Sequence, residues 1–552
     1  MGEGSAVPLG VAEPSAPGGG AWRPTNRFLA RAAVLTAALT AAGALLGLVR
    51  DQLLAHTFGA GTDTDAFLVA WTVPEFAATL LIEDGMALIL IPAFSSALAR
   101  RTTGDDPVRA LVRATLPKAA LGMSAAAGLL VLAAPWLVPV LAPGLPQQRL
   151  AVDCTRLTAT CVLTFTLAGY CSAALRAHGR FLPPAAINIA YNMGILTAVV
   201  LLGPAWGVRA AAAGVAAGGV LMVLVQAPSL WRQLTGERAR AEGKRAPAGG
   251  LVVALLAPVI VFAATRQSQV LVERFLAAPL PAGAISHLNY AQKVAQLPMV
   301  LSLMMCTVTF PVVARAMAAG DTDTARRRVE RDLLLAGVIV LAGGATVIAA
   351  APQIVELLFQ RGAFDRADTA ATAAVMRIYA LGLLGHTLVS ALVRCYFSAS
   401  TPLWYPAAVM TAGVAVTAGA GLAFAGPWGA VGIAAANALG ITLSAALLLI
   451  GVRRQSIPLA VGPLVRGLAR LTAAAAVATA AGWLCAGAAG APLAAAPVAL
   501  VTVTVVFVAA ACALRAPVVP SLVRTASRRL AHGHSEHPPV DGDVPLDRRP
   551  HE

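Results

Sequence analysis

Charged residues are scarce in this chain. Only 12% of its 552 residues are Asp, Glu, Lys or Arg, whereas 58% are hydrophobic, and the mean hydropathy is +0.75. A soluble globular protein carries roughly 25% charged residues, so the composition excludes that class. Apolar segments of about 20 residues recur between short polar breaks, each long enough to cross about 30 Å of hydrocarbon as a helix. They lack the period-two alternation of outer-membrane strands. We therefore predict an all-α, polytopic membrane protein.

Signatures of catalysis and metal binding are also missing. The sequence has no Walker loop, no nucleophile elbow and no HExxH motif. Its seven cysteines all fall in apolar stretches without metal-ligand spacing, which favours packing roles. The polar breaks are too short to hold a catalytic domain. We therefore expect a transporter without covalent chemistry that needs no metal or other cofactor.

Hydropathy predicts about fourteen spans. They cover residues 28–57, 63–98, 110–142, 151–176, 183–203, 207–231, 250–278, 283–316, 333–351, 366–398, 402–425, 428–452, 465–487 and 491–514.

Cations gather in every second break between these spans. Clusters such as Arg100–Arg101, Arg326–Arg328 and Arg453–Arg454 belong to the cation-rich set, and the other breaks are nearly bare. By the positive-inside rule the cation-rich breaks face the cytoplasm, so both termini are cytoplasmic and the number of spans is even. We expect a multi-pass protein of the bacterial inner membrane. The same distribution accounts for the net charge of +15 without a nucleic-acid partner.

The longest cytoplasmic break divides the chain near its middle. Two-lobed transporters bind their substrate between two such halves, near the membrane midplane. We predict a disordered cytoplasmic arm (1–26), an N-terminal six-helix lobe (27–231), a cytoplasmic linker (232–249), a C-terminal six-helix lobe (250–454), a terminal helix pair (465–515) and a disordered cytoplasmic tail (516–552).

Ionisable residues inside the predicted spans carry the functional signal. A charge near the bilayer centre costs about 3 kcal/mol on insertion scales, so such a residue normally faces a protein cavity. Lys293 and Arg266 lie mid-span, and we predict that they face such a cavity. Because ammonium and guanidinium groups pair with phosphate oxygens, the central cations indicate an anionic headgroup. Supporting roles are assigned to Asp51, Glu83, Glu273, Arg274 and Arg377.

Several of these residues also have a structural interpretation, which the sequence leaves open. Arg50–Asp51 could be a satisfied ion pair, and Asp65 could be the N-cap of its own helix. Glu83–Asp84 could mark a helix break. A lone intramembrane histidine such as His386 is more often packed than part of a proton relay.

Short motifs in a fixed order resemble a known family. They are Gly47–Asp51 (GLVRD), Phe58–Phe67 (FGAGTDTDAF) with Pro74 and Pro92, Tyr290–Lys293 (YAQK) with Pro298, Leu358–Phe364 (LFQRGAF) and Arg394–Pro402 (RCYFSASTP). Each motif is short, but the ordered set resembles the MurJ (MviN) lipid II flippase family from about residue 27 to residue 515.

This resemblance implies a fourteen-helix fold of the multidrug/oligosaccharidyl-lipid/polysaccharide exporter superfamily. It implies that the substrate is lipid II, the undecaprenyl-diphosphate-linked peptidoglycan precursor, moved to the outer leaflet by alternating access. Arg50 and Lys293 would contact the headgroup, and Asp65 would be the functional acidic residue of the second span. The implied substrate-binding set is therefore Arg50, Asp65 and Lys293, joined by the mid-span Arg266. Lys293 stands where the family usually has arginine, so it keeps the charge but not the bidentate fork.

Two departures from the family pattern keep other functions open. Ala44 and Ala78 stand where the family usually has arginine, so two expected cavity cations are missing. The eleventh and twelfth spans contain no Asp or Glu, which favours coupling to membrane potential or protons over sodium. The chain could instead flip another polyprenyl-linked glycan, or act as a non-transporting scaffold that binds cell-wall synthesis or division proteins. An exporter of cationic drugs is less consistent with the cationic spans. A membrane-bound transferase is less consistent with the absence of catalytic motifs.

Overall fold

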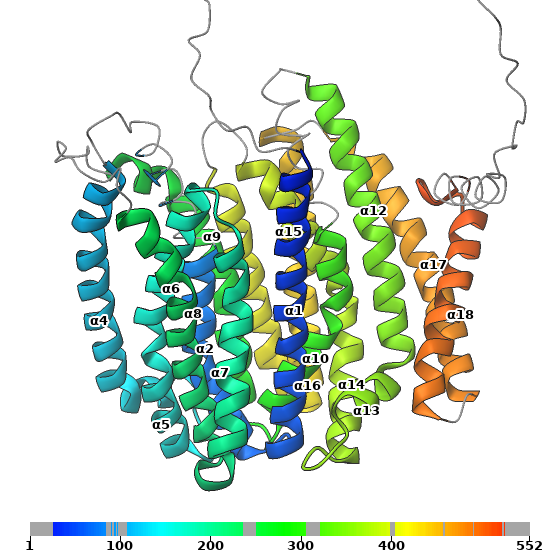
Figure 1. The fold of residues 1–552 in the computed structure, drawn as a ribbon. Coiled ribbons are helices and arrows are strands. Elements are labelled where there is room, and N and C mark those ends of the chain that lie inside the picture. Colours follow the sequence, from blue (N-terminus) through cyan, green and yellow to red (C-terminus); the bar gives the residue numbers. More distant parts are fainter. Residues whose placement is uncertain are drawn as a thin grey trace, which may run out of the picture.

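The chain folds into a single bundle of long helices, most of them roughly parallel or antiparallel to one another (Figure 1). The computed structural model describes residues 26–83, 90, 93–94, 97, 107–235, 250–304, 321–397, 403–455, 459–488, 491–520 and 524. Within these ranges every regular element is helical, so the predicted all-α class is confirmed.

The first half of the chain supplies the helices on the left and at the centre of Figure 1. They are α1 (Asn26–Phe58), α2 (Thr62–Ala77), the π-helix η1 (Ala78–Glu83), α4 (Pro107–Leu141), α5 (Gln148–Ala159), α6 (Cys161–Ala177), α7 (Leu182–Trp206) and α8 (Arg209–Thr235).

The second half supplies the remaining helices, and its last two lie side by side at the right edge of Figure 1. They are α9 (Gly250–Ala277), α10 (Ala284–Ala295), α12 (Thr322–Ala349), α13 (Ala351–Phe359), α14 (Arg366–Leu381), α15 (Leu383–Phe397), α16 (Tyr405–Gln455), α17 (Val461–Ala488) and α18 (Pro492–Ala513).

Each of the fourteen predicted spans overlaps a described helix. Ten described helices are long and apolar enough to cross a membrane, and the bent pair α14–α15 makes an eleventh candidate. α16 contains two of the predicted spans. The helix is interrupted near their junction, at Gly429 (φ 56°, ψ −137°), a backbone conformation in which a residue with a side chain would be strained. The predicted arm, linker and tail lie largely outside the described residues, although residues 232–235 of the linker belong to α8.

One boundary differs clearly from the prediction. α12 begins at Thr322, whereas hydropathy places the start of this span at residue 333. The Asp321 side chain caps the helix by accepting a hydrogen bond from the backbone N–H of Thr324, at 2.9 Å. The intervening turns are rich in arginine, so hydropathy detects only the apolar part of a longer helix.

Helices pack mainly with others of their own half. α1 packs on α7, α7 on α8 and α2 on α5, while α9 packs on α16, α10 on α14 and α15 on α16; α17 and α18 pack on each other and on α12. The α7–α8 contact is close, because a Cβ atom at Gly194 would lie 2.6 Å from the Cα of Gly218. Small residues on α8 allow this close approach, since a Cβ atom at Gly214 would likewise lie 2.8 Å from the Cα of Ile195 on α7.

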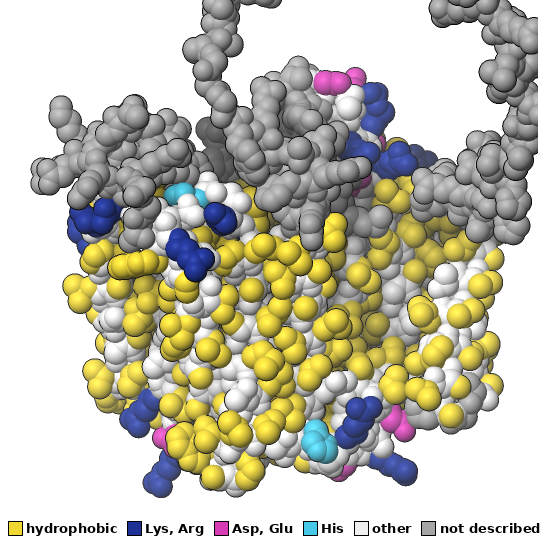
Figure 2. All heavy atoms as spheres, viewed as in Figure 1, with side chains coloured by type: hydrophobic (Ala, Val, Ile, Leu, Met, Phe, Trp, Pro, Cys, Tyr) yellow, Lys and Arg dark blue, Asp and Glu magenta, His cyan; other side chains and the backbone are white. Residues whose placement is uncertain are grey.

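The outer surface is apolar across its middle. Figure 2 shows a broad hydrophobic band on the viewed face, with Lys and Arg side chains along its upper and lower borders. Large apolar side chains such as Leu121, Trp136 and Leu201 are exposed. A soluble protein rarely exposes so large an apolar area, so this band is the surface that meets the hydrocarbon of the bilayer.

Candidate functional site

Arg50 and Asp51 of α1 form a buried ion pair inside the bundle. Arg50 donates from Nε and Nη2 to Oδ1 of Asp51, at 3.0 and 2.8 Å, and from Nη1 to Oδ1 of Asn192 on α7, at 2.9 Å. Asn192 itself donates to the carbonyl oxygens of Gly43 and Asn188. These bonds hold the guanidinium in one position, as a buried charge requires.

Lys293 of α10 brings a second cation to the same carboxylate. Its Nζ lies 3.4 Å from Oδ1 of Asp51, so two cations share one acidic group and one positive charge is left over. The side chain of Lys293 is 31% exposed, against 10% for Arg50 and 8% for Asp51. Lys293 is therefore the most exposed charged side chain of this group.

The ring of Trp71 on α2 lies beside both cations. Its centroid is 4.7 Å from Cζ of Arg50 and 5.4 Å from Nζ of Lys293, within the range of cation–π attraction. Trp71 also packs edge-on against Phe67 and Tyr191, which fix the ring. We call Arg50, Asp51, Trp71 and Lys293 the central cluster. It joins α1 and α2 of the first half to α10 of the second and carries a net positive charge.

The neighbouring residues Glu273 and Arg274 of α9 point to different halves of the molecule. Arg274 forms an ion pair with Glu75 of α2, with Nη2 2.7 Å from Oε2, and also donates to the hydroxyl of Thr72. Glu273 stays within the second half and accepts from the hydroxyl of Tyr379 at 2.6 Å. α9 therefore uses one residue to contact the first half and the next residue to anchor itself in its own half.

Glu273 belongs to a buried polar chain of the second half. Besides Tyr379 of α14, its carboxylate accepts from Nδ2 of Asn437 on α16. The Oδ1 of Asn437 lies 3.2 Å from Nε2 of His386 on α15. His386 is thus hydrogen-bonded through Asn437 rather than simply packed against apolar side chains.

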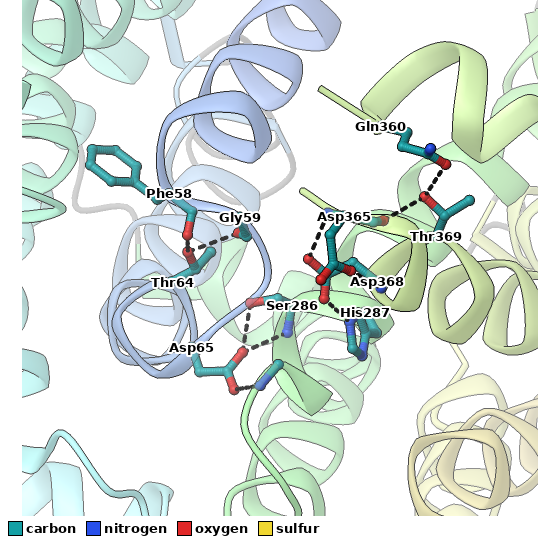
Figure 3. A network of polar contacts seen from close by, with 11 residues as sticks. Phe58, Gly59, Thr64, Asp65, Ser286, His287, Gln360, Asp365, Asp368 and Thr369 are labelled. Carbon is teal, nitrogen blue, oxygen red and sulfur yellow. Dashed lines mark hydrogen bonds and ion pairs between the residues drawn. The ribbon is translucent and has the colours of Figure 1, made fainter. Parts of the chain in front are cut away.

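Asp65 lies at one end of the bundle, where it binds a helix of the opposite half (Figure 3). Its Oδ2 accepts from the backbone N–H of Gly283, at 2.7 Å, and its Oδ1 accepts from the N–H and hydroxyl of Ser286, at 2.8 and 2.6 Å. Gly283 is the N-cap of α10, so Asp65 caps that helix from α2. The carboxylate is buried and satisfied by these bonds, and it is not part of the central cluster.

The two halves touch closely at this end, which we call the Gly59 end (bottom of Figure 1). A Cβ atom at Gly59 (φ +65°) would lie 2.6 Å from the carbonyl oxygen of Ala363, and one at Gly283 (φ +90°) would lie 2.5 Å from that of Ala60. The backbone N–H of Ala363 donates to the carbonyl of His56 at 2.9 Å. Backbone therefore meets backbone across the interface, and this end of the bundle is closed.

The other predicted site residues lie outside the central cluster. Arg266 of α9 is half-buried and has no hydrogen bond or ion pair with another described residue. Arg377 donates from Nε to the carbonyl of Ile348 near the end of α12, which is a helix-end contact. The side chain of Glu83 falls outside the described residues, and Ala44 is exposed on α1.

Sequence reasoning missed two residues of this region, Trp71 and Asn192. An aromatic residue in an apolar helix and a single asparagine are common in packed spans, so neither gave a signal of its own. Both become recognisable only because the fold places α2 and α7 beside Arg50.

Comparison with known proteins gives consistent matches along most of the chain. The family model described as "Lipid II flippase MurJ" matches residues 54–505. The lipid II flippase MurJ of Burkholderia cenocepacia is 26% identical over 440 residues, which cover 78% of this chain and 84% of that protein. The probable lipid II flippase MurJ of Synechocystis is 27% identical over 476 residues, covering 83% and 88%.

Solved structures show the same fold. A lipid II flippase MurJ in an inward closed conformation superposes with a TM-score of 0.71 at 18% identity, covering 87% of this chain and 99% of that one. An inward-facing multidrug transporter of the MATE family, in the MOP superfamily, gives a TM-score of 0.60 at 15% identity, covering 79% and 99%.

Proposed function

Because this chain belongs to the lipid II flippase MurJ family, we propose that it moves lipid II from the cytoplasmic to the outer leaflet of the bacterial inner membrane. It does so by alternating access of one site to the two leaflets and makes or breaks no covalent bond. The observation that carries this proposal at the level of residues is the central cluster. It is a buried group with an excess positive charge, placed where the two halves of a membrane transporter meet.

The central cluster is suited to a diphosphate headgroup. Lys293 is its accessible cation, and an ammonium ion binds phosphate oxygens as a compact point charge. Arg50 is held behind it by Asp51 and Asn192, so it contributes positive potential without having to move. The Trp71 ring offers an apolar and aromatic face beside both charges.

The charge pattern of the breaks supports an orientation. Arg100–Arg101, Arg326–Arg328 and Arg453–Arg454 are expected in the cytoplasm, and so are both termini. The Gly59 end, which belongs to the cation-poor set of breaks, then faces the outside. The structure accordingly corresponds to a state in which the path to the outer leaflet is closed.

Release to the outer leaflet requires the Gly59 end to open. The contacts that must break are the three hydrogen bonds of Asp65 and the backbone bond from Ala363 to His56. We assign to Asp65 the role of holding this end closed, in place of the substrate-binding role predicted from the sequence. The residue remains functional on this account, but through the conformational equilibrium.

Complementation tests the proposal. Cells depleted of their own lipid II flippase should grow when they express this chain, and a Lys293→Ala variant should fail to support growth at equal membrane abundance. Arg209→Ala is the matched control, because Arg209 is an exposed arginine that pairs with Asp153 outside the central cluster. Normal growth with Lys293→Ala would refute the assignment of the headgroup site.

The missing cations at Ala44 and Ala78 favour one alternative, a flippase for another polyprenyl-linked glycan. Purified protein in vesicles separates the two functions, because the outward movement of labelled lipid II and of a different polyprenyl-diphosphate glycan can be compared directly. A chain that moves neither lipid but captures cell-wall synthesis or division proteins would be a scaffold instead.

A further inference from the structure

A cavity lined by both charged and apolar residues lies at the end of the bundle opposite the Gly59 end. It has a volume of about 370 Å³ and sits between the α6–α7 turn and the last turns of α8. Ligand pockets commonly measure about 300–1,000 Å³, so it is large enough for a small polar group. Its lining consists of the turn residues 179–183 together with Ser229, Arg232 and Gln233.

Two arginines give this cavity its charge. Arg180 of the turn and Arg232 of α8 both line it, and neither guanidinium group has a hydrogen bond or ion pair with another described residue. Ser229 and Gln233 are four residues apart on α8, so their hydroxyl and amide groups lie on the same face as the guanidinium of Arg232. Two uncompensated guanidinium groups with neutral donors beside them form a site for phosphate oxygens.

Apolar side chains line the same cavity. Phe181 and Leu182, which belong to the lining, are 49% and 40% exposed; Trp231 is not part of the lining, but it is the chain neighbour of Arg232 and is 69% exposed. Exposed tryptophan at the end of a membrane helix is typical of the interface between headgroups and hydrocarbon. A ligand in this position therefore meets cations and an apolar surface at once, as the phosphate and glycerol region of a phospholipid does.

The cavity is separate from the central cluster. Asn192, the partner of Arg50, follows Leu182 by ten residues on α7, which corresponds to about 15 Å along the helix axis. The cavity also lies at the end of α8 where the cation-rich breaks are found, which is the cytoplasmic side in the orientation proposed above.

We propose that this cavity binds the phosphodiester headgroup of an anionic phospholipid, such as phosphatidylglycerol, from the cytoplasmic leaflet. Arg180 and Arg232 contact the phosphate, Ser229 and Gln233 add hydrogen bonds, and Phe181 lies along the start of the acyl chains. The proposal goes beyond flipping, because it concerns a lipid that stays bound while the substrate moves.

Native mass spectrometry of the full-length protein with phosphatidylglycerol or phosphatidylcholine tests this assignment. The double variant Arg180→Gln/Arg232→Gln should bind phosphatidylglycerol about tenfold more weakly, or worse, since two charge-assisted contacts are lost. The matched control is Arg113→Gln/Lys118→Gln, which removes two exposed cations of α4 that do not line the cavity and should leave binding unchanged. The Arg180→Lys/Arg232→Lys variant keeps both charges and should bind phosphatidylglycerol with intermediate strength. Such binding would show that the loss in the glutamine variant comes from the missing charges and not from misfolding.

Three results would overturn the proposal. Equal loss of phosphatidylglycerol from the cavity and control variants would mean that lipid is held by general surface charge. Displacement of the lipid by millimolar inorganic phosphate would identify a site for a soluble anion. Preference for undecaprenyl phosphate over phosphatidylglycerol would assign the cavity to the substrate lipid. None of these outcomes depends on whether the chain moves lipid II.

Discussion

Replacing Asp65 by asparagine should open the Gly59 end of the molecule. The carboxylate accepts three hydrogen bonds from α10, and bonds to a charged acceptor contribute about 1.5–3 kcal/mol each. Asparagine keeps one oxygen for the two donors of Ser286, but it places an NH₂ group opposite the N–H of Gly283. Donor then faces donor, and we expect the closed state to lose about 2–4 kcal/mol relative to the open one.

This loss corresponds to a change of about 30- to 1,000-fold in the ratio of closed to open molecules. A closed state favoured by about 100 to 1 would fall to between about 3 to 1 and 1 to 10. The change is large enough to be seen as a second population, while both states remain folded.

Distances between spin labels measure these populations directly. Thr57 of α1 and Ala367 of α14 are exposed on opposite halves at the Gly59 end, so cysteines there can be labelled once the native cysteines are replaced. The parent protein should give one short distance, and Asp65→Asn should add a longer one. Asp63→Asn is the matched control, because Asp63 is exposed two residues away and its side chain makes no hydrogen bond or ion pair with α10 in the described structure.

Ser286→Ala provides a graded comparison. It removes only the hydroxyl bond of 2.6 Å and keeps both backbone donors, so its effect should be smaller than that of Asp65→Asn. If Asp65→Asn left the distance distribution unchanged, the inference that Asp65 holds the outer end closed would be refuted.

Two further changes test other contacts, one buried in the second half and one at the Gly59 end. Tyr379→Phe removes the 2.6 Å hydrogen bond to the buried carboxylate of Glu273 and should lower the free energy of unfolding by about 1–3 kcal/mol. The loss would be measured as a drop in the thermal midpoint of unfolding. An unchanged midpoint would mean that this hydrogen bond contributes little to stability. Gly362→Ala strains a position at φ +62° and drives a Cβ into the carbonyl of His56, so it should also populate the open Gly59 end in the spin-label experiment. Gly179→Ala has a similar backbone angle but open space around it and should not, so equal behaviour of the two variants would argue against a specific contact.

Residues that act within one helix could be predicted from the sequence. Arg50 and Asp51 are adjacent in an apolar span, and the structure contains the ion pair that this adjacency suggests. The spans themselves follow from hydropathy, since the bilayer imposes a length on each apolar segment. The structure differs from the hydropathy prediction at the break in α16, which falls at Gly429, and at the early start of α12. These two boundaries depend on backbone geometry and capping rather than on the length of an apolar segment.

Residues that act across the two halves could not be predicted in the same way. Asp65 has the composition of an N-cap for its own helix, yet it caps α10, more than 200 residues later in the chain. Glu273 and Arg274 are neighbours in sequence, but their partners belong to different halves. Helical periodicity indicates which face a side chain occupies and carries no information about which helix packs on that face.

The charged contacts between the halves suggest how substrate binding and opening are coupled. Three such contacts involve described residues: Asp65 with α10, Arg274 with Glu75, and Lys293 with Asp51. The last is the longest, at 3.4 Å, and its cation is also the more exposed of the two that pair with Asp51. A diphosphate that approaches Lys293 competes with Asp51 for the same ammonium group, so its binding weakens one of the contacts that hold the halves together. Because the Asp51 carboxylate stays paired with Arg50, that exchange leaves no buried charge unsatisfied. We infer that the substrate lowers the cost of the rearrangement that releases it, and that Lys293 matters for both steps.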